Sequence, residues 1–196
     1  MRKVILTMHM SLDGFIAGPN GELDWTAADE AVDNDLPELL STADTALVGR
    51  VLYQGFASYW PSYDTTNPAK SKGEIAFAHW INEAPKLVFS TTLAKTEWKN
   101  SRVVPVKMDA DIAEEVARLK QQPGENLLLF GGVRIAQTFA RLGLIDEYWL
   151  LIQPKVLGNG RPLFIDIKDR INLKLVSAWT HDTIGAVAVR YQPVRE

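Results

Sequence analysis

The sequence contains no cysteine, which excludes disulfide bonds, thiolate catalysis and cysteine-ligated metals. Its three histidines, His9, His79 and His181, lack metal-ligand spacing, so no metal site is expected and core or surface roles are favoured for them. The formal net charge is only −3 and the basic residues are scattered, so neither a nucleic acid nor a membrane surface is an expected partner. No apolar run approaches the length of a membrane span or a signal peptide, and the cytoplasm is therefore the expected location.

Three catalytic signatures are also missing. Neither a Gly-x-Ser-x-Gly nucleophile elbow nor a Walker lysine motif occurs, which argues against a hydrolase and against phosphate transfer. The complete dinucleotide fingerprint Gly-x-Gly-x-x-Gly is absent as well. The chain of 196 residues has 46% hydrophobic content and no evident linker, which predicts one domain covering residues 1–196 and a small-molecule partner.

The most informative stretch joins a predicted strand to a predicted helix. Residues 126–130 are typical of a short buried strand, and residues 133–142 carry an amphipathic helical pattern. The transition falls on Gly131-Gly132, where the missing side chains would let a ligand approach the free amides of the first helical turn. Such amides attract phosphate. The alternative is that the two glycines simply connect a strand to a helix.

Strands and helices alternate through most of the remaining chain. We predict strands over 3–12, 45–48, 86–89, 103–106 and 145–153, helices over 29–42, 51–59, 74–83 and 109–121, and a closing hairpin over 173–180 and 186–192. Pro37 should kink or break its helix. The alternation predicts an α/β fold with a mostly parallel central sheet and an antiparallel hairpin at its edge.

Ligands of such sheets bind beyond the carboxyl ends of the strands. That rule places four segments on one edge: 13–18, 49–50, 90–91 and 131–132. A guanidinium gives phosphate a planar fork of donors and hydroxyls add others, so Arg50, Ser90 and Thr91 are candidates for binding the 2′-phosphate of NADP. Taken singly, Arg50 is also compatible with a solvated helix position, and the hydroxyl run with a turn or a cap.

The motifs occur in a familiar order. They are Ser11-Leu-Asp-Gly14-x-Ile-Ala17, Gly49-Arg50-x-x-Tyr53, Phe89-Ser90, Phe130-Gly131-Gly132-x-Arg134 and Pro154-x-x-Leu157-Gly158-x-Gly160-x-Pro162-Leu-Phe164. Together they resemble the dihydrofolate-reductase-like superfamily over nearly the whole chain. The resemblance is greatest to the branch with the reductase domain of the riboflavin-biosynthesis deaminase-reductase and its stand-alone bacterial relatives.

This resemblance implies a mostly parallel sheet of about eight strands, bound NADPH, and hydride transfer to a nitrogen heterocycle or a sugar-linked carbon at the aldehyde level. It implies that Ile16 and Ala17 border the nicotinamide, that Arg50 with Ser90 and Thr91 holds the 2′-phosphate, and that residues 131–135 wrap the pyrophosphate. The residues implied in cofactor binding are Ile16, Ala17, Gly49, Arg50, Ser90, Thr91, Gly131, Gly132, Val133, Arg134 and Ile135. Trp25 matches the tryptophan of the family's flexible substrate loop.

A proton donor is expected shortly after that tryptophan. Asp29 and Glu30 both lie near Trp25, and Asp13 is a third candidate. A raised carboxylate pKa would require burial. The alternative for Asp29 and Glu30 is that acidic residues at a helix start are solvated and interact only with the helix dipole.

The sequence does not identify the substrate. The hydroxyl that accompanies the acid in folate reduction is missing, since its place falls near Leu151 or Gln153. A riboflavin-pathway substrate is also not established, because the deaminase domain is absent and no additional basic cluster marks a ribose-phosphate site. His9 is a candidate substrate contact because the first strand borders the expected nicotinamide pocket, and Tyr53 and Trp60 could stack on a flat substrate or pack in the core.

We therefore predict an NADPH-dependent reductase of unknown substrate. The alternative is a nucleotide-binding or sensor protein that retains the pocket without turnover. Sparse catalytic machinery is expected, because nicotinamide carries the hydride. The apolar C-terminal hairpin, with Trp149 and Trp179 nearby, predicts a homodimer that covers an exposed sheet edge, as is usual in the family branch.

Overall fold

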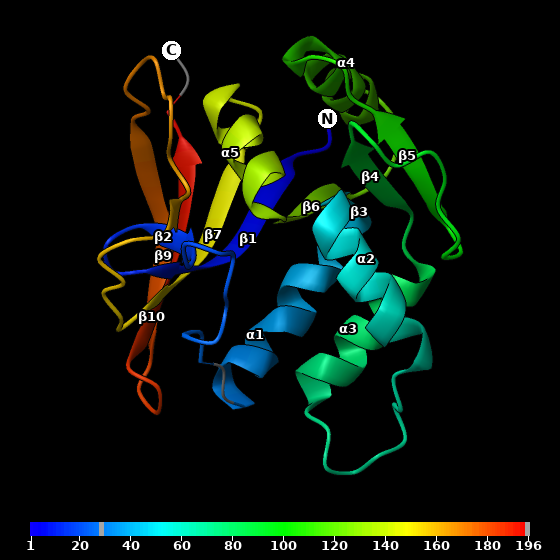
Figure 1. The fold of residues 1–196 in the computed structure, drawn as a ribbon. Helices are drawn as coiled ribbons and strands as arrows, with labels where there is room; N and C mark the ends of the chain where they lie inside the picture. The colour runs from blue at the N-terminus through cyan, green and yellow to red at the C-terminus, as the bar shows by residue number, and fades with distance from the viewer. Residues whose placement is uncertain (28–29, 195–196) are drawn as a thin grey trace.

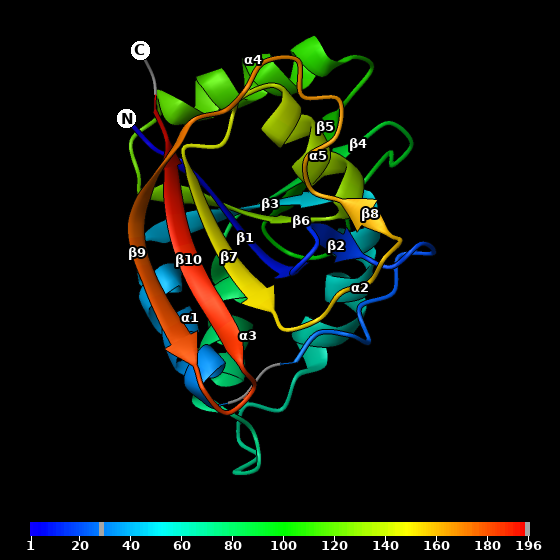
Figure 2. The same ribbon diagram turned by 90° about the vertical axis from the view of Figure 1, so that its left-hand side faces the viewer.

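The computed structural model describes residues 1–27 and 30–194, and residues 30–34 by their backbone alone. An eight-stranded sheet forms its centre (Figure 1), and a separate two-stranded sheet lies beside it (Figure 2). The strands are β1 (Val4–Ser11), β2 (Phe15–Ala17), β3 (Ala43–Gly49), β4 (Lys86–Ser90), β5 (Ser101–Pro105), β6 (Asn126–Gly131), β7 (Glu147–Gln153), β8 (Arg161–Pro162), β9 (Leu173–His181) and β10 (Ala186–Pro193). The helices are α1 (Glu30–Ser41), α2 (Arg50–Tyr59), α3 (Lys72–Glu83), α4 (Asp109–Lys120) and α5 (Val133–Arg141), with a 3-10 turn, η1 (Trp60–Ser62).

The strand order in the large sheet is β5-β4-β3-β6-β1-β7-β10-β9. The neighbours from β5 to β7 are parallel, whereas β10 pairs antiparallel with both β7 and β9. The predicted fold class, a mostly parallel α/β sheet with an antiparallel hairpin at its edge, is confirmed. β1 lies near the centre of the sheet, where Leu6 is opposite Leu129 on one side and Tyr148 on the other.

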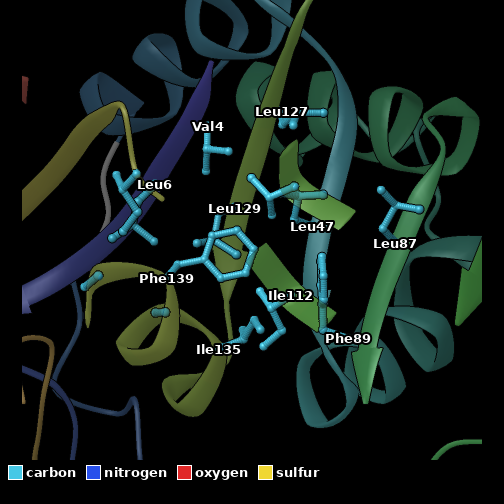
Figure 3. Packing of buried hydrophobic residues seen from close by; sticks show 14 of the residues in the cluster. Val4, Leu6, Leu47, Leu87, Phe89, Ile112, Leu127, Leu129, Ile135 and Phe139 are labelled. Carbon is cyan, nitrogen blue, oxygen red and sulfur yellow. The ribbon is translucent and has the colours of Figure 1, made fainter. Parts of the chain in front are cut away.

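Helices cover both faces of the parallel strands, which explains why these strands are nearly continuous apolar runs. The helices α1, α2 and α3 lie on one side of the sheet, and α4 and α5 lie on the other (Figure 1). Successive residues of a strand point to opposite faces, so Val4 and Leu6 belong to one buried cluster and Ile5 to the other. Figure 3 shows Phe139 of α5 beside Leu6 and Leu129, and all three are completely buried.

Of the kink or break predicted at Pro37, the break does not occur, because α1 continues through this residue. A proline inside a helix costs about 3 kcal/mol or more. The apolar face of α1 offsets this cost: Leu39 and Leu40 are buried in the cluster beneath the helix, and Leu36 packs against it. Tertiary packing thus outweighs the local preference of proline.

None of the helices in the described part of the chain is long and apolar enough to cross a membrane.

Candidate active site

Four neighbouring parallel strands end at one edge of the sheet. The strands β4, β3, β6 and β1 lie side by side in this order. Gly49 is opposite Phe89, and Val48 is opposite Gly131. Ser90, Gly49 and Gly131 therefore lie at the ends of adjacent strands, and the structure brings together the segments that the sequence placed on this edge.

The two glycines between β6 and α5 have backbone conformations that side chains disfavour. Gly131 has a φ of 85°, and Gly132 has a φ of 80° with a ψ of 135°. A Cβ added to Gly132 would lie 3.7 Å from the Cα atom of Gly49 on the next strand. Gly132 begins α5 without a side-chain cap, and the first turn contains no acidic residue. The amides of Val133 and Arg134 have no acceptor within the helix and are available to an anion.

A second helix, α2, begins at the same edge. It starts at Arg50, directly after Gly49, again with no side-chain cap and no acidic residue in its first turn. Arg50 is exposed, and its Nη1 atom donates to Oε1 of Gln54 at 3.0 Å. A guanidinium has five N–H donors, so the remaining ones are available. The buried side chain of Ile135 supports this start, since a Cβ added to Gly49 would lie 3.3 Å from it.

The hydroxyl run after β4 has the local role that was considered as an alternative. The buried Oγ atom of Ser90 accepts hydrogen bonds from the amides of Thr92, at 3.1 Å, and Leu93, at 2.9 Å. Ser90 thus stabilises a turn, although its hydroxyl hydrogen remains available to donate. Thr91 is exposed beside it.

Ile16 and Ala17 lie in β2 and are both buried. β2 pairs with β8 in a small antiparallel sheet. Gly160, just before β8, is so close that an added Cβ would lie 2.5 Å from the carbonyl oxygen of Ala17. This small sheet holds β2 against the end of β1.

Asp13 is not suited to be a proton donor, and this prediction is corrected. Its carboxylate accepts hydrogen bonds from the Ser11 hydroxyl at 2.7 Å and from the amides of Leu157 and Gly158 at 3.1 and 2.8 Å. The bond from Ser11, followed by those from the two amides, lowers the pKa of Asp13. The group therefore stays ionised and joins the loop after β1 to the loop after β7.

A cavity of about 180 Å³ lies between α1 and the sheet, on the other side of β1 from the glycine pair's strand. Its floor follows one row of the sheet, in which His9 is opposite Leu151 and Leu151 is opposite Ala188. It is lined by Thr7, Met8, His9, Asp35, Leu36, Leu39, Trp149, Leu151, His181 and Ala188. Its volume is similar to the roughly 150 Å³ of an enclosed cavity that admits benzene, so it is on the scale of a single six-membered ring.

The fully buried Gln153 ends β7 beside this cavity. Its Oε1 atom accepts from the amide of Ala27 at 3.2 Å, and its Nε2 atom donates to the carbonyl oxygen of Ala27 at 2.8 Å. The same Nε2 atom lies 3.0 Å from Nδ1 of His9, and burial lowers the pKa of His9. Segment 18–27, which carries the half-buried Trp25, is thereby attached to the end of β7.

Asp35 lies at the other end of the cavity and was not predicted as a site residue. Its Oδ2 atom accepts from Nε1 of Trp179 at 2.7 Å and lies 3.0 Å from Nε2 of His181. This approach lacks hydrogen-bond alignment, so neither ring nitrogen of the buried His181 has a hydrogen-bond partner among the described residues. Trp179 and His181 alternate along β9 and so share a face, which is the one sequence signal that groups them.

Two predicted substrate contacts are corrected. Tyr53 is buried, and its hydroxyl accepts from the amides of Glu97 and Trp98 at 3.2 Å, so it belongs to the core and supports the β4–β5 connection. Trp60 packs edge-to-face on Phe77 and is not among the residues that line the cavity. The core-packing alternative for this aromatic cluster is therefore correct.

The predicted acids cannot be placed. Asp29 lies outside the described residues. Glu30 begins α1, but its side chain is outside the described part of the chain.

Comparison with known proteins identifies the family. Residues 2–184 match the family model described as the RibD C-terminal domain. The chain belongs to the RibD C-terminal domain family. It is 38% identical over 190 residues to the uncharacterized protein YyaP of Bacillus subtilis (strain 168), a match that covers 97% of this chain and 94% of YyaP.

Solved structures show a similar fold over nearly the whole chain. A putative riboflavin biosynthesis protein from Shewanella sp. PV-4 is 25% identical, with a TM-score of 0.69 over 98% of this chain and 99% of that one. Dihydrofolate reductase from Enterococcus faecalis complexed with NADP(H) is 14% identical, with a TM-score of 0.61 over 98% and 97% of the two chains. The predicted resemblance and the dihydrofolate-reductase-like fold are confirmed.

Proposed function

We propose that this chain is an NADPH-dependent reductase that transfers a hydride to a small heterocyclic substrate of the pyrimidine or pteridine kind. Membership of the RibD C-terminal domain family supports reductase chemistry in general. The observation that carries the proposal is that two helices without side-chain caps, α2 and α5, begin side by side, directly after Gly49 and Gly131-Gly132. The ring-sized cavity lies on the other side of β1 from β6, the strand that ends at the glycine pair.

The residues at the sheet edge fit the cofactor. Backbone amides at the start of α5 suit a pyrophosphate, and the exposed guanidinium of Arg50 suits an additional phosphate. The Ser90 hydroxyl hydrogen and Thr91 lie on the adjacent strand end, and Ile16 and Ala17 lie beside the end of β1. When bound, NADPH supplies the hydride.

The protein's own contribution is to hold the substrate and to keep water away. The cavity walls are mainly apolar, with Leu36, Leu39 and Trp149 among them. Segment 18–27 is fixed over the strand ends by Gln153. We assign proton delivery to Asp29 or Glu30, since the hydrogen bonds of Asp13 keep it ionised.

Binding and turnover of NADPH test the proposal. Binding is followed by the fluorescence of the six tryptophans. Oxidation is followed at the absorbance band of NADPH over a panel of pteridines, pyrimidines, flavins and quinones. We expect oxidation with at least one heterocycle. Tight binding without oxidation across the panel would instead support the alternative, a nucleotide-binding or sensor protein.

We also propose that two chains associate through the outer face of β9 and β10. In Figure 2 no helix of the described chain lies in front of these strands. Their outer face carries exposed apolar side chains, including Leu175, which is opposite Tyr191, and Val187, four residues from Tyr191 on β10. Such a face is typical of an interface between copies.

Sedimentation at micromolar concentration is expected to give twice the chain mass of 21.9 kDa. Val187→Glu should shift the protein to a monomer, because it places a charge in the interface. Val51→Glu is the control, since Val51 is an exposed valine on α2. A wild-type monomer across this range, or dissociation by both variants alike, would contradict the proposed interface.

A further inference from the structure

The orientation of the Gln153 side chain is determined by the backbone. Its oxygen faces the amide of Ala27, and its nitrogen faces the carbonyl of the same residue. In a reversed amide, the side-chain nitrogen would face the amide of Ala27, another donor, and the oxygen would face its carbonyl, another acceptor. The completely buried Gln153 therefore has one permitted orientation.

That orientation fixes the proton of His9. One hydrogen of the Gln153 amide nitrogen goes to Ala27, and the other faces Nδ1 of His9 at 3.0 Å. Because an amide nitrogen only donates, Nδ1 must accept. A neutral imidazole that accepts through Nδ1 carries its hydrogen on Nε2. If Nδ1 were protonated, its N–H would face the N–H of Gln153. Burial also lowers the pKa of His9 and so disfavours the charged ring.

The Nε2 hydrogen of His9 has no hydrogen-bond acceptor among the described residues, and His9 lines the cavity. The other titratable groups that line it are Asp35 from α1 and His181 from β9. The lining of the cavity thus includes an N–H donor on β1 and, on α1, the Asp35 carboxylate, which also accepts from Trp179. An apolar floor that includes Leu151 and Ala188 separates the two.

We propose that His9, held as its Nε2–H tautomer by Gln153, donates a hydrogen bond to an acceptor atom of the substrate ring. This inference rests on the proposed function, and it assigns His9 to substrate contact and Gln153 to positioning. The ligand class that matches both ends is a planar nitrogen heterocycle with a carbonyl or ring-nitrogen acceptor on one edge and an amino or N–H group on the other. A carboxylate-bearing ring is disfavoured by Asp35.

The tautomer can be read directly from protein labelled with ¹⁵N in its histidine rings. The chain has three histidines, and His79→Gln and His181→Gln assign the signals. We expect His9 to be neutral with an unprotonated Nδ1, and to remain so as the pH falls through the ordinary value of 6.5. A protonated Nδ1, or titration near that value, would overturn the inference.

Gln153→Glu tests the positioning role. A carboxylate accepts where the amide donated, so Nδ1 of His9 should become protonated. Gln137→Glu is the matched control, because the half-buried Gln137 on α5 donates to the carbonyl of Pro162 and should leave the His9 signals unchanged. An unchanged tautomer in folded Gln153→Glu would contradict the role of Gln153. If that variant does not fold, the tautomer of His9 in the wild-type spectrum and the binding measurements still test the inference.

Isocytosine, which carries an acceptor and an amino group on one ring, serves as the probe, with benzene as the control. We expect isocytosine to shift the Nε2 signal of His9 and benzene not to. His9→Leu should weaken isocytosine binding about three- to tenfold. His9→Gln, which keeps an N–H donor, should recover part of the loss, and NADPH affinity should not change.

The outcomes separate this inference from the proposed function. Isocytosine binding against His9 without any NADPH oxidation would overturn the reductase proposal and leave the role of His9 standing. NADPH oxidation with isocytosine binding equal in wild type and His9→Leu would overturn the role of His9 alone. Absence of isocytosine binding to the wild type would overturn the ligand class.

Discussion

Gly132→Ala is expected to weaken NADPH binding about a hundredfold or more. The φ and ψ values of Gly132, 80° and 135°, lie in a region that alanine disfavours, at a cost of about 1–3 kcal/mol. The chain will relieve this strain by moving the start of α5. That movement displaces at least two amides from the pyrophosphate, and each hydrogen bond to a charged group contributes roughly 1.5–3 kcal/mol. Each 1.4 kcal/mol corresponds to about a tenfold change in affinity.

Gly143→Ala is the matched control for this change. Gly143 also has a positive φ, of 64°, but it follows the other end of α5, and an added Cβ meets no atom within 4 Å. Both variants should lose about 1–2 kcal/mol of stability, measured by urea unfolding. Only Gly132→Ala should lose cofactor affinity, measured by tryptophan fluorescence. Equal affinities in the two variants would mean that the glycine pair only connects a strand to a helix.

Arg50→Gln is expected to weaken NADPH binding about tenfold to a hundredfold, because one charge-assisted contact contributes roughly 1.5–3 kcal/mol. The affinity for NADH should barely change, since NADH lacks the phosphate that Arg50 would contact. The structure favours this role, because Arg50 is exposed at an uncapped helix start and its first turn has no acidic residue. Fluorescence titrations with both cofactors measure the difference.

Arg118→Gln controls for the loss of a positive charge. Arg118 is an arginine on α4 that pairs with Glu115 three residues away. Its replacement should leave the affinities for both cofactors unchanged. If Arg50→Gln weakens the binding of NADPH and NADH equally, or changes the binding of neither, Arg50 is only a surface residue and the 2′-phosphate site lies elsewhere.

Features with local causes could be predicted from the sequence. The torsions at Gly131-Gly132 depend on adjacent residues, and the apolar runs of β3, β4 and β6 reflect burial between two helical layers. The turn at Ser90 is local too. The sequence left two interpretations of this residue open, because a hydroxyl can stabilise a turn or bind a phosphate. The order of glycine-ended strands was sufficient to predict the sheet edge.

Contacts between distant strands could not be predicted in the same way. His9 and Gln153 are 144 residues apart, and so are Asp35 and Trp179. His9 meets Gln153 through the register of β1 on β7. Asp35 meets Trp179 through the pairing of β10 with β7 and β9 and through the docking of α1. A shift of one residue would move these side chains to the opposite face. The substrate end of the site therefore depends on tertiary pairing that no local pattern encodes.

The position of β1 in the sheet also has a consequence for folding. Its neighbours β6 and β7 begin at Asn126 and Glu147, so β1 is synthesised long before either partner exists. Until then its apolar side chains, including Val4 and Leu6, have no strand beside them. Folds built on such distant pairings tend to fold slowly, in about milliseconds to seconds. Until β6 and β7 have been made, the growing chain therefore exposes an unpaired apolar strand, and aggregation competes with folding in such a state.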